Sequence, residues 1–306
     1  MIEPTLTVAN AIRSVTRRLA EAKIEGPARD ARLLVAAAAS LSPEALFAHP
    51  EAELLPNALV RLETAVLRRL AREPIARIQG HRAFYGRDFA ISPDVLDPRP
   101  DTEILVELAL VIAGELRLGD ADARPAPPLR ILDIGTGSGA IIVTLLAERP
   151  DAIGVATDLS AAALDIAAQN ARTHGVSDRL QLVETDLVRD LAGTFEIIVS
   201  NPPYIASGDI AGLADEVKYY DPRAALDGGV DGIAFYRRIA KEVPPLMSAG
   251  GWLAVEVGCG QASEVEALFI NEFHEEVAPY DRPDAVRAGW DLSGIHRCVA
   301  VKALSV

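Results

Sequence analysis

The residues with the clearest chemical potential form a short loop, Asn201-Pro202-Pro203-Tyr204, which directly follows the apolar run Phe195–Ser200. Proline has no backbone N–H and a fixed φ, so the loop presents carbonyl oxygens and the Asn201 side chain as oriented polar groups. Asn201 Oδ1 and the Pro202 carbonyl can each accept one N–H of a substrate –NH2 group, and Tyr204 can lie against the planar face beside it. The loop therefore predicts a site for a primary amide or an aromatic amine. The alternative is a polyproline-like loop with Tyr204 packed in the core.

A glycine-rich loop follows the apolar run Ile131–Ile134 and precedes an expected helix. It reads Gly135-Thr136-Gly137-Ser138-Gly139. Glycines let the backbone turn sharply after a strand and approach a ligand closely before a helix begins. With Ala140 the loop also fits the G-x-G-x-x-G/A dinucleotide fingerprint, so a nicotinamide or flavin enzyme remains an alternative. A tight turn that binds nothing is the other alternative.

Two acidic residues follow the next two expected strands. Asp158 comes after the expected strand Ile153–Thr157, about 20 residues beyond the glycines, where a carboxylate can accept hydrogen bonds from both ribose hydroxyls of an adenosine. The competing interpretation is that Asp158 or Ser160 caps the following helix. Asp186 can receive the adenine amino group, although acidic residues are common in such loops. Together with the glycines, these residues predict an adenosine-containing cofactor.

A methyl donor accounts for this combination of loops better than a hydride donor, because a dehydrogenase has no need of two prolines and an aromatic residue after a strand. The nitrogen of a primary amide is a poor nucleophile, since its lone pair is delocalised. Two acceptors that hold both N–H bonds turn the lone pair toward an electrophile, and positioning of this kind can contribute about 7–11 kcal/mol. S-adenosylmethionine supplies a sulfonium methyl group, so neither a metal nor a covalent enzyme intermediate is required.

A sheet must bring these loops together, and after Leu129 the chain alternates expected strands with expected helices. This alternation predicts an α/β fold with a mostly parallel seven-stranded sheet that is covered on both faces. The expected strands are Arg130–Ile134, Ile153–Thr157, Leu180–Val183, Phe195–Ser200, Trp252–Val257, Val277–Tyr280 and His296–Lys302. The expected helices are Thr102–Leu116, Gly139–Glu148, Ala161–His174, Ile233–Glu242 and Ala262–Glu272.

The chain before this region has a different character. Residues 1–73 are rich in Ala, Leu and Arg at helical spacing, which predicts a small N-terminal bundle of short amphipathic helices. Residues 74–98 are predicted to be a linker, with a β-hairpin and a glycine turn over Ile75–Leu96. Residues 99–306 then form the α/β domain. The expected N-terminal helices include Ala28–Ala39, a short one opened by Ser42-Pro43-Glu44, and Pro56–Leu70.

Charge and composition exclude several classes of protein. The formal net charge is −14, and residues 91–306 carry 17 Lys+Arg against 34 Asp+Glu. Such an acidic body repels a phosphate backbone, so we expect no direct nucleic-acid partner. Cys259 and Cys298 cannot build a disulfide framework, and no Cys/His cluster offers a metal site. No apolar run approaches the ~18 residues of a membrane span, and the first residues lack the pattern of an export signal. We therefore expect a cytoplasmic monomer without a membrane partner.

These motifs strongly resemble those of class I S-adenosylmethionine-dependent methyltransferases, and nearly the whole chain resembles the release-factor glutamine methyltransferase family (PrmC/HemK). Besides the two loops, the resemblance rests on Glu73-Pro74-Ile75, Pro98–Glu103, Ala225–Gly229 with Asp231-Gly232, and Asp291–Arg297. It implies a Rossmann-like domain that methylates N5 of the glutamine in the Gly-Gly-Gln motif of bacterial class I peptide chain release factors. S-adenosyl-L-methionine would be the cofactor and S-adenosyl-L-homocysteine the product.

Carried over by position, the resemblance implies a role for each loop. Gly135, Thr136, Gly137, Ser138 and Gly139 would line the methionine end of the cofactor, Asp158 would hold the ribose, and Asp186 and Leu187 would flank the adenine. Asn201, Pro202, Pro203 and Tyr204 would bind the glutamine amide, with Asn201, Pro202 and Tyr204 as catalytic residues and Asn201 also beside the cofactor. The helical residues 1–73 would dock the protein substrate.

The chain departs from the family pattern in two places. Leu187 stands where some relatives have an aromatic residue against the adenine, and Tyr220-Asp221-Pro222 stands where a Glu-Pro pair is expected. Arg99 and Glu103 are candidates for the mouth of the site. Two other functions remain open from the residues alone. An adenine-N6 DNA or RNA methyltransferase would need the same two acceptors, and a non-catalytic adenosyl-cofactor-binding protein would need only the glycine loop.

Overall fold

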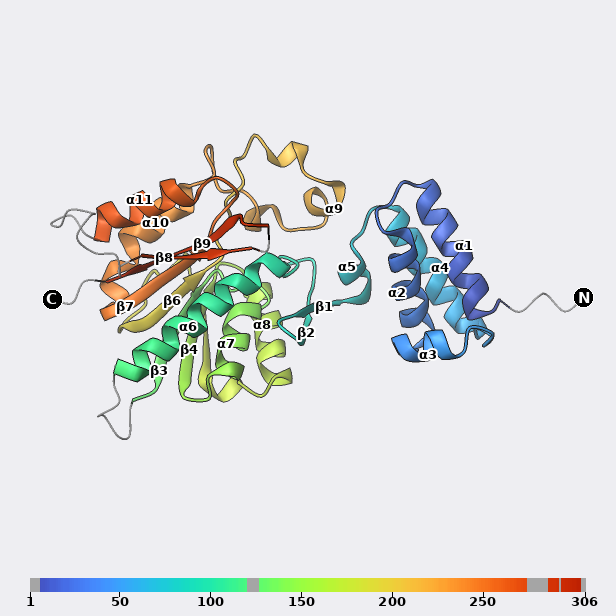
Figure 1. Ribbon diagram of the computed structural model, residues 1–306, viewed down its shortest axis with the longest axis horizontal. Helices are drawn as coiled ribbons and strands as arrows, with labels where there is room; N and C mark the ends of the chain where they lie inside the picture. Colours follow the sequence, from blue (N-terminus) through green and yellow to red (C-terminus); the bar gives the residue numbers. More distant parts are fainter. Residues whose placement is uncertain (1–5, 120–126, 274–285, 292, 304–306) are drawn as a thin grey trace, which may run out of the picture. The chain divides into compact units, whose positions relative to one another are not determined.

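The computed structural model describes residues 6–119, 127–273, 286–291 and 293–303 (Figure 1). The chain divides into two compact units. The first contains residues 1–81 together with residues 214–220, and the second contains residues 82–213 together with residues 221–306. Each unit is built around its own apolar core, as expected for domains of this size.

The first unit is helical. Its helices are α1 (Val8–Glu21), α2 (Pro27–Ala39), α3 (Pro43–Ala48), α4 (Pro56–Leu70), α5 (Ile75–Gln79) and α9 (Asp215–Lys218). Local sequence starts them. The Thr7 side chain accepts a hydrogen bond from the Asn10 N–H at the start of α1, and Ser42 accepts one from the Ala45 N–H at the start of α3. Helices α2, α3 and α4 each have proline at the first turn, where no backbone donor is lost.

One buried arginine links three segments of this unit. Arg69 of α4 donates to Asp30 of α2 at 2.7 Å and to Glu216 of α9 at 3.2 Å. The charges of Arg69 and Asp30 are nearly inaccessible to solvent, so this pair depends on its hydrogen bonds to offset desolvation. The Tyr220 hydroxyl also donates to the Ala71 carbonyl at 2.6 Å. These contacts explain why residues 214–220, which are far along the chain, belong to the first unit.

The hairpin expected over Ile75–Leu96 is shorter than predicted. Ile75–Gln79 forms helix α5, which begins after Pro74 and ends at Gly80, whose φ of +77° lies in the left-handed region. The two strands are β1 (His81–Phe84) and β2 (Arg87–Ala90). Tyr85 and Gly86 between them both have positive φ, as a two-residue hairpin turn requires.

The second unit contains a seven-stranded sheet in the order β5-β4-β3-β6-β7-β9-β8. The strands are β3 (Leu129–Ile134), β4 (Ala152–Asp158), β5 (Leu180–Glu184), β6 (Phe195–Ser200), β7 (Met247–Glu256), β8 (Val286–Trp290) and β9 (His296–Lys302). The first five run parallel, and β9 is antiparallel to both β7 and β8. The expected α/β class with a mostly parallel seven-stranded sheet is confirmed.

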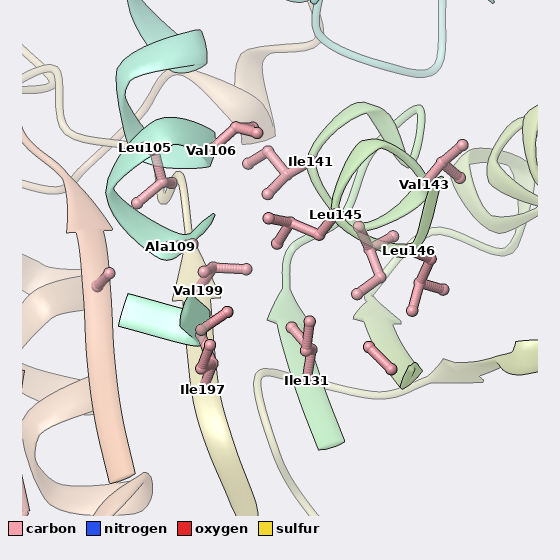
Figure 2. Packing of buried hydrophobic residues seen from close by; sticks show 14 of the residues in the cluster. Leu105, Val106, Ala109, Ile131, Ile141, Val143, Leu145, Leu146, Ile197 and Val199 are labelled. Atoms are coloured by element: carbon pink, nitrogen blue, oxygen red, sulfur yellow. The ribbon is translucent and has the colours of Figure 1, made fainter. Parts of the chain in front are cut away.

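Helices cover both faces of this sheet, as Figure 1 shows. One face packs against α6 (Glu103–Gly119), α7 (Ala140–Glu148) and α8 (Ala161–Thr173), and the other against α10 (Ala234–Glu242) and α11 (Ala262–Phe273). Helix α7 is buried on nearly every side, which is why its sequence is apolar almost throughout. Figure 2 shows side chains of α6 and α7 packed over β3 and β6, among them Leu105, Ala109, Ile141, Leu145, Ile131, Ile197 and Val199.

Strand β9 has the expected bounds, but β8 and the start of β7 differ from the prediction. The expected strand Val277–Tyr280 lies outside the described residues, and the outermost described strand is instead Val286–Trp290, which was not predicted. Strand β7 begins at Met247, five residues before the expected Trp252, and its pairing with β6 shifts register between Phe195 and Ile197. The polar and glycine residues that open β7 hid this extension from a pattern of apolar alternation. No described helix is long and apolar enough to cross a bilayer.

Candidate active site

The strand order reverses between β3 and β6, and the carboxyl ends of parallel strands at such a point form a ligand-binding crevice. Ile134 pairs with Ser200, so Gly135 and Asn201 are the next residues on two neighbouring strands. The Ser200 hydroxyl also donates to the Ile134 carbonyl at 2.8 Å. The two loops that sequence analysis singled out are therefore side by side, although 66 positions separate them.

A cavity of about 620 Å³ opens at this edge of the sheet. The loops after four strands line it, and they contribute most of the predicted site residues. These are Gly135, Thr136, Gly137 and Ser138 after β3, Asp158 at the end of β4, Asp186 and Leu187 after β5, and Asn201, Pro202 and Pro203 after β6. A volume of this size lies in the range of small-molecule and cofactor sites.

The glycine loop owes its shape to three residues with positive φ, namely Gly135, Gly137 and Gly139. A Cβ on Gly135 or Gly137 would meet nothing within 4 Å, so these two leave open space for a ligand. A Cβ on Gly139 would lie 3.1 Å from the Cβ of Ala167, so Gly139 permits close packing of α7 against α8. Gly139 is not among the described residues that line the cavity.

Asp158 supports the glycine loop directly. Its Oδ2 accepts from the Gly137 N–H at 2.9 Å, and its Oδ1 accepts from the Ser160 N–H at 2.9 Å. Ser160 is the residue that caps α8, because its side chain accepts from the Ala163 N–H. Each carboxylate oxygen of Asp158 has a further lone pair, so both can still accept from a ligand hydroxyl.

Asp186 faces the cavity with a fixed charge. Arg238 of α10 donates to its Oδ1 at 2.8 Å, and this hydrogen bond holds the pKa of Asp186 below its usual range. Leu187 lines the cavity with a φ of +55°, a backbone conformation that costs a leucine roughly 1–2 kcal/mol. Among the described lining residues, the aromatic side chain is Phe235 of α10. Sequence analysis missed Arg238 and Phe235. Both lie on α10, about 50 positions after Asp186, and no sequence pattern indicated that this helix reaches the cavity.

The Asn201 side chain is anchored at one end. Its Nδ2 donates to Oγ1 of Thr102 at 3.2 Å, so Oδ1 is the end of the amide that can accept from a ligand. Tyr204 has a different environment from the rest of its loop. It is not among the described residues that line the cavity, and its hydroxyl donates to Oε1 of Glu256 at 3.3 Å. Burial, together with the negative charge of Glu256, raises the pKa of Tyr204.

Two buried acids lie behind the lining residues, and neither was a predicted site residue. Burial raises the pKa of Asp133 to about 7 despite a 2.7 Å hydrogen bond from Thr136, and its Oδ1 has no partner among the described residues. Burial also raises the pKa of Glu256, at the end of β7, to about 7. An acidic residue that ends an apolar run was the available signal for Glu256.

The motifs beyond the two loops have structural roles here. A Cβ on Gly228 would lie 2.8 Å from the Pro203 carbonyl, so this glycine lets residues 225–229 pack against the loop at Asn201–Tyr204. Asp291 accepts from the Ile295 N–H and from Arg297, and Arg297 also pairs with Asp101 at 3.0 Å. Glu103 accepts from the Tyr85 N–H instead of lining the cavity.

Arg99 is the basic residue among the described lining residues, and it pairs with Asp221 at 2.6 Å. The acidic lining residues are Asp94, Asp158, Asp186 and Asp227. This excess of carboxylates favours a cationic ligand over a pyrophosphate. No group of three His, Cys, Asp or Glu residues in the described part of the chain could hold a metal ion.

Two family models match parts of the chain. The model of the PrmC N-terminal domain matches residues 10–80, and the model of the methyltransferase small domain matches residues 122–216. The crystal structure of the hMettl16 catalytic domain in complex with a MAT2A 3′UTR hairpin has a TM-score of 0.50 and 19% sequence identity, covering 80% of this chain and 81% of that one. At this identity the likeness shows the fold alone.

Sequence relatives are much closer. A Rhodospirillum rubrum release factor glutamine methyltransferase is 44% identical over 288 residues, which are 93% of this chain and 82% of the relative. The Cereibacter sphaeroides protein of the same description is 44% identical, covering 86% of this chain and 90% of the relative. That of Bradyrhizobium diazoefficiens is 41% identical, covering 97% and 95%. The chain therefore belongs to the release factor glutamine methyltransferase family.

Proposed function

We propose that the protein transfers a methyl group from S-adenosyl-L-methionine to N5 of the glutamine in the Gly-Gly-Gln motif of bacterial class I peptide chain release factors. The observation that carries this proposal is that one cavity is lined by the glycine loop at Gly135–Ser138 and by Asn201, Pro202 and Pro203. An adenosyl cofactor and a substrate amide can thus occupy one cavity. Family membership supports the same substrate class.

The residues present suit S-adenosylmethionine. Its sulfonium and ammonium groups are positive, and the lining carboxylates of Asp94, Asp158, Asp186 and Asp227 offer negative charge. Asp158 would hold the ribose, and Asp186 and Leu187 would flank the adenine. When bound, the cofactor supplies a sulfonium methyl group and leaves as S-adenosylhomocysteine. The same carboxylates would repel the negatively charged pyrophosphate of a nicotinamide cofactor, which disfavours a nicotinamide enzyme.

Asn201 and Pro202 would orient the glutamine. Because Nδ2 is engaged with Thr102, Asn201 Oδ1 is the end of the amide that would accept one N–H of the substrate –NH2 group, and the Pro202 carbonyl would be the second acceptor. Two N–H bonds held in this way keep the amide from rotating and stabilise positive charge that develops on nitrogen. The methylated nitrogen is acidic enough to release its proton to water, so no strong base is required. The sequence predicted that Tyr204 lies against the planar face of the substrate amide. We propose instead that Tyr204, through its hydrogen bond to Glu256, supports the loop from the side away from the cavity.

The first unit, residues 1–81, would dock the protein substrate. Its core is separate from that of the second unit, and its surface carries exposed apolar side chains such as Phe47, Val60 and Leu67. Exposed apolar side chains of this kind can contact a protein partner. Residues 74–98 would serve as the linker and residues 99–306 as the methyltransferase domain. We further propose that the enzyme acts as a cytoplasmic monomer and contacts no nucleic acid directly.

Transfer of a tritiated methyl group decides the substrate class. The protein is incubated with labelled S-adenosylmethionine and, separately, with a class I release factor, tRNA and duplex DNA. We expect label in the release factor, abolished when the Gly-Gly-Gln glutamine of the factor is replaced. Label in nucleic acid and none in protein would instead assign an adenine-N6 methyltransferase, because an adenine amino group presents the same two hydrogens. Cofactor binding without transfer to any substrate would assign a non-catalytic module.

A further inference from the structure

The two ends of the Asn201 amide have opposite hydrogen-bonding character, and only the oxygen can accept a substrate N–H. The reaction proposed above therefore depends on which end faces the cavity. In the structure Nδ2 is turned to Oγ1 of Thr102, at 3.2 Å. Thr102 is buried and ends the 3₁₀ turn Pro100–Thr102 that leads into α6, so its position is fixed by the fold.

Glu256 lies near the hydroxyls of Thr102 and Tyr204. The Tyr204 hydroxyl donates to its Oε1 at 3.3 Å, and the nearby Thr102 hydroxyl acts to lower the pKa of Glu256. Glu256 is almost fully buried, with 2% of its surface exposed, and its Oε2 has no hydrogen bond in the described part of the chain. A buried carboxylate with so few donors attracts each nearby hydroxyl proton strongly.

The direction of these hydrogen bonds fixes the amide. An ionised carboxylate can only accept, so it directs the single proton of the Thr102 hydroxyl toward itself. Oγ1 of Thr102 can then only accept from Asn201, and an acceptor at this point selects Nδ2 over Oδ1. We propose that Thr102 is a positioning residue that keeps Oδ1 of Asn201 facing the substrate amide. The inference rests on the proposed function, but it concerns the orientation of one side chain.

Protonation of Glu256 would remove this selection, because a protonated carboxyl group can donate to Thr102 and leave the hydroxyl proton free to turn to Asn201. The titratable groups around Glu256 are Tyr204, Asp101 beside Thr102, Arg297 and Cys298 of β9, and Tyr236 of α10. Burial raises the pKa of Glu256 to about 7, and Asp101 acts in the same direction while Arg297 opposes it. The orientation of Asn201 should therefore be better defined above neutral pH than below it.

Substitution at position 102 tests the role of the hydroxyl. Thr102→Val keeps the side-chain shape and removes the acceptor, and we expect kcat for a release factor to fall about tenfold, the effect of one hydrogen bond. The KM for the factor and the calorimetric Kd for S-adenosylmethionine should stay within about twofold. Thr102→Ser restores the hydroxyl and should recover most of the lost turnover. The matched control is Thr144→Val in α7, where the buried Oγ1 makes no hydrogen bond among the described residues.

A pH profile separates positioning from packing. We expect kcat of the wild-type enzyme to rise between pH 6 and 8 and the profile of Glu256→Gln to be flatter over that range, because an amide does not ionise there. Unfolding midpoints of all variants identify any that merely lose stability. Equal kcat for Thr102→Val and the wild type, or an equal loss for Thr102→Ser and Thr102→Val, would overturn the proposal.

The outcomes remain distinguishable from failure of the proposed function. If the wild-type enzyme labels nucleic acid and not the release factor, the proposed function is wrong. The comparison of Thr102→Val with Thr102→Ser is then made on that substrate, because an adenine amino group needs the same free oxygen of Asn201. If the release factor is labelled and Thr102→Val is unaffected, the proposed function stands and the positioning role fails.

Discussion

The carboxylate of Asp158 accepts a hydrogen bond of 2.9 Å from the backbone N–H of Gly137, so the end of one strand is tied to the loop that follows its neighbour. The backbone of the loop is also hydrogen-bonded to the same strand, since the N–H groups of Gly135 and Thr136 donate to the Thr157 carbonyl at 2.9 and 2.8 Å. These hydrogen bonds within the chain hold the glycine loop in shape, which would reduce the ordering that binding of the proposed cofactor requires.

Replacement of Asp158 should therefore affect the cofactor more than the substrate. We expect Asp158→Ala to weaken S-adenosylmethionine binding at least tenfold, about 1.4 kcal/mol, because it removes both the proposed ribose acceptor and the support of Gly137. Isothermal titration calorimetry measures the change. Asp165→Asn, at an exposed position of α8, is the control for loss of a nearby negative charge. An unaltered Kd for Asp158→Ala would remove the ribose assignment.

Replacement of Asn201 should have the opposite signature. Asn201→Ala removes an oriented acceptor that matters most when charge develops on the substrate nitrogen, and loss of one such contact costs ~3–4 kcal/mol. We expect kcat to fall on the order of 10²–10³-fold while calorimetric cofactor affinity changes little. Asn57→Ala, on the exposed side of α4, serves as the matched control. Normal turnover of a release factor by Asn201→Ala would reject the role given to this side chain.

Docking by the first unit can be tested without deleting it, which matters because residues 214–220 pack with its helices. Val60 and Leu67 lie seven positions apart on α4 and are 69% and 56% exposed. The double variant Val60→Ser, Leu67→Ser should raise KM for a whole release factor roughly thirtyfold, if each of the two apolar contacts contributes ~1 kcal/mol, and leave the kinetics of a short Gly-Gly-Gln peptide unaltered.

The matched control for that double variant is Val111→Ser, which alters an apolar side chain 54% exposed on α6 of the second unit. It should leave both substrates unaffected. Parallel losses on the intact factor and on the peptide in the Val60→Ser, Leu67→Ser enzyme would count against docking through α4.

The stability of the ligand-free enzyme should fall as pH rises from about 4 to 7, in part because of Asp133. Burial raises its pKa from 3.8 to about 7, so the folded protein binds more protons than the unfolded chain in this window. The contribution of protonated Asp133 to the free energy of unfolding is fully present below pH 3.8 and is lost as pH rises through 7. The total is on the order of 4 kcal/mol at 1.36 kcal/mol per pKa unit.

Asp133→Asn removes this titration. We expect the free energy of unfolding of the variant, relative to the wild type, to increase between pH 4 and pH 8, as measured by urea denaturation at each pH. A matched acidic control is Asp165→Asn, whose side chain is exposed. If the difference in free energy of unfolding between Asp133→Asn and the wild type does not change with pH, Asp133 ionises normally in the folded protein.

Several features of the fold could be predicted from local patterns alone. Apolar runs bounded by glycine, such as Ile131–Ile134, indicated strands that are buried on both faces, and strand–helix alternation indicated a parallel sheet. Proline at a first turn and Ser42 as a cap indicated where N-terminal helices begin. The short helix Ile75–Gln79 was missed, because five residues carry too weak a periodic signal to outweigh the nearby glycine and aromatic residues of the hairpin.

By itself, the sequence determined which backbone segments can turn, cap or donate, since these properties belong to single residues and their immediate neighbours. It thereby identified the loops at Gly135–Gly139 and Asn201–Tyr204. Only the tertiary structure decided which side chains complete the site. Thr102 meets Asn201 across 99 positions, and Glu256 meets Tyr204 across 52, because hydrogen bonds between strands and helices depend on distance in space and not along the chain.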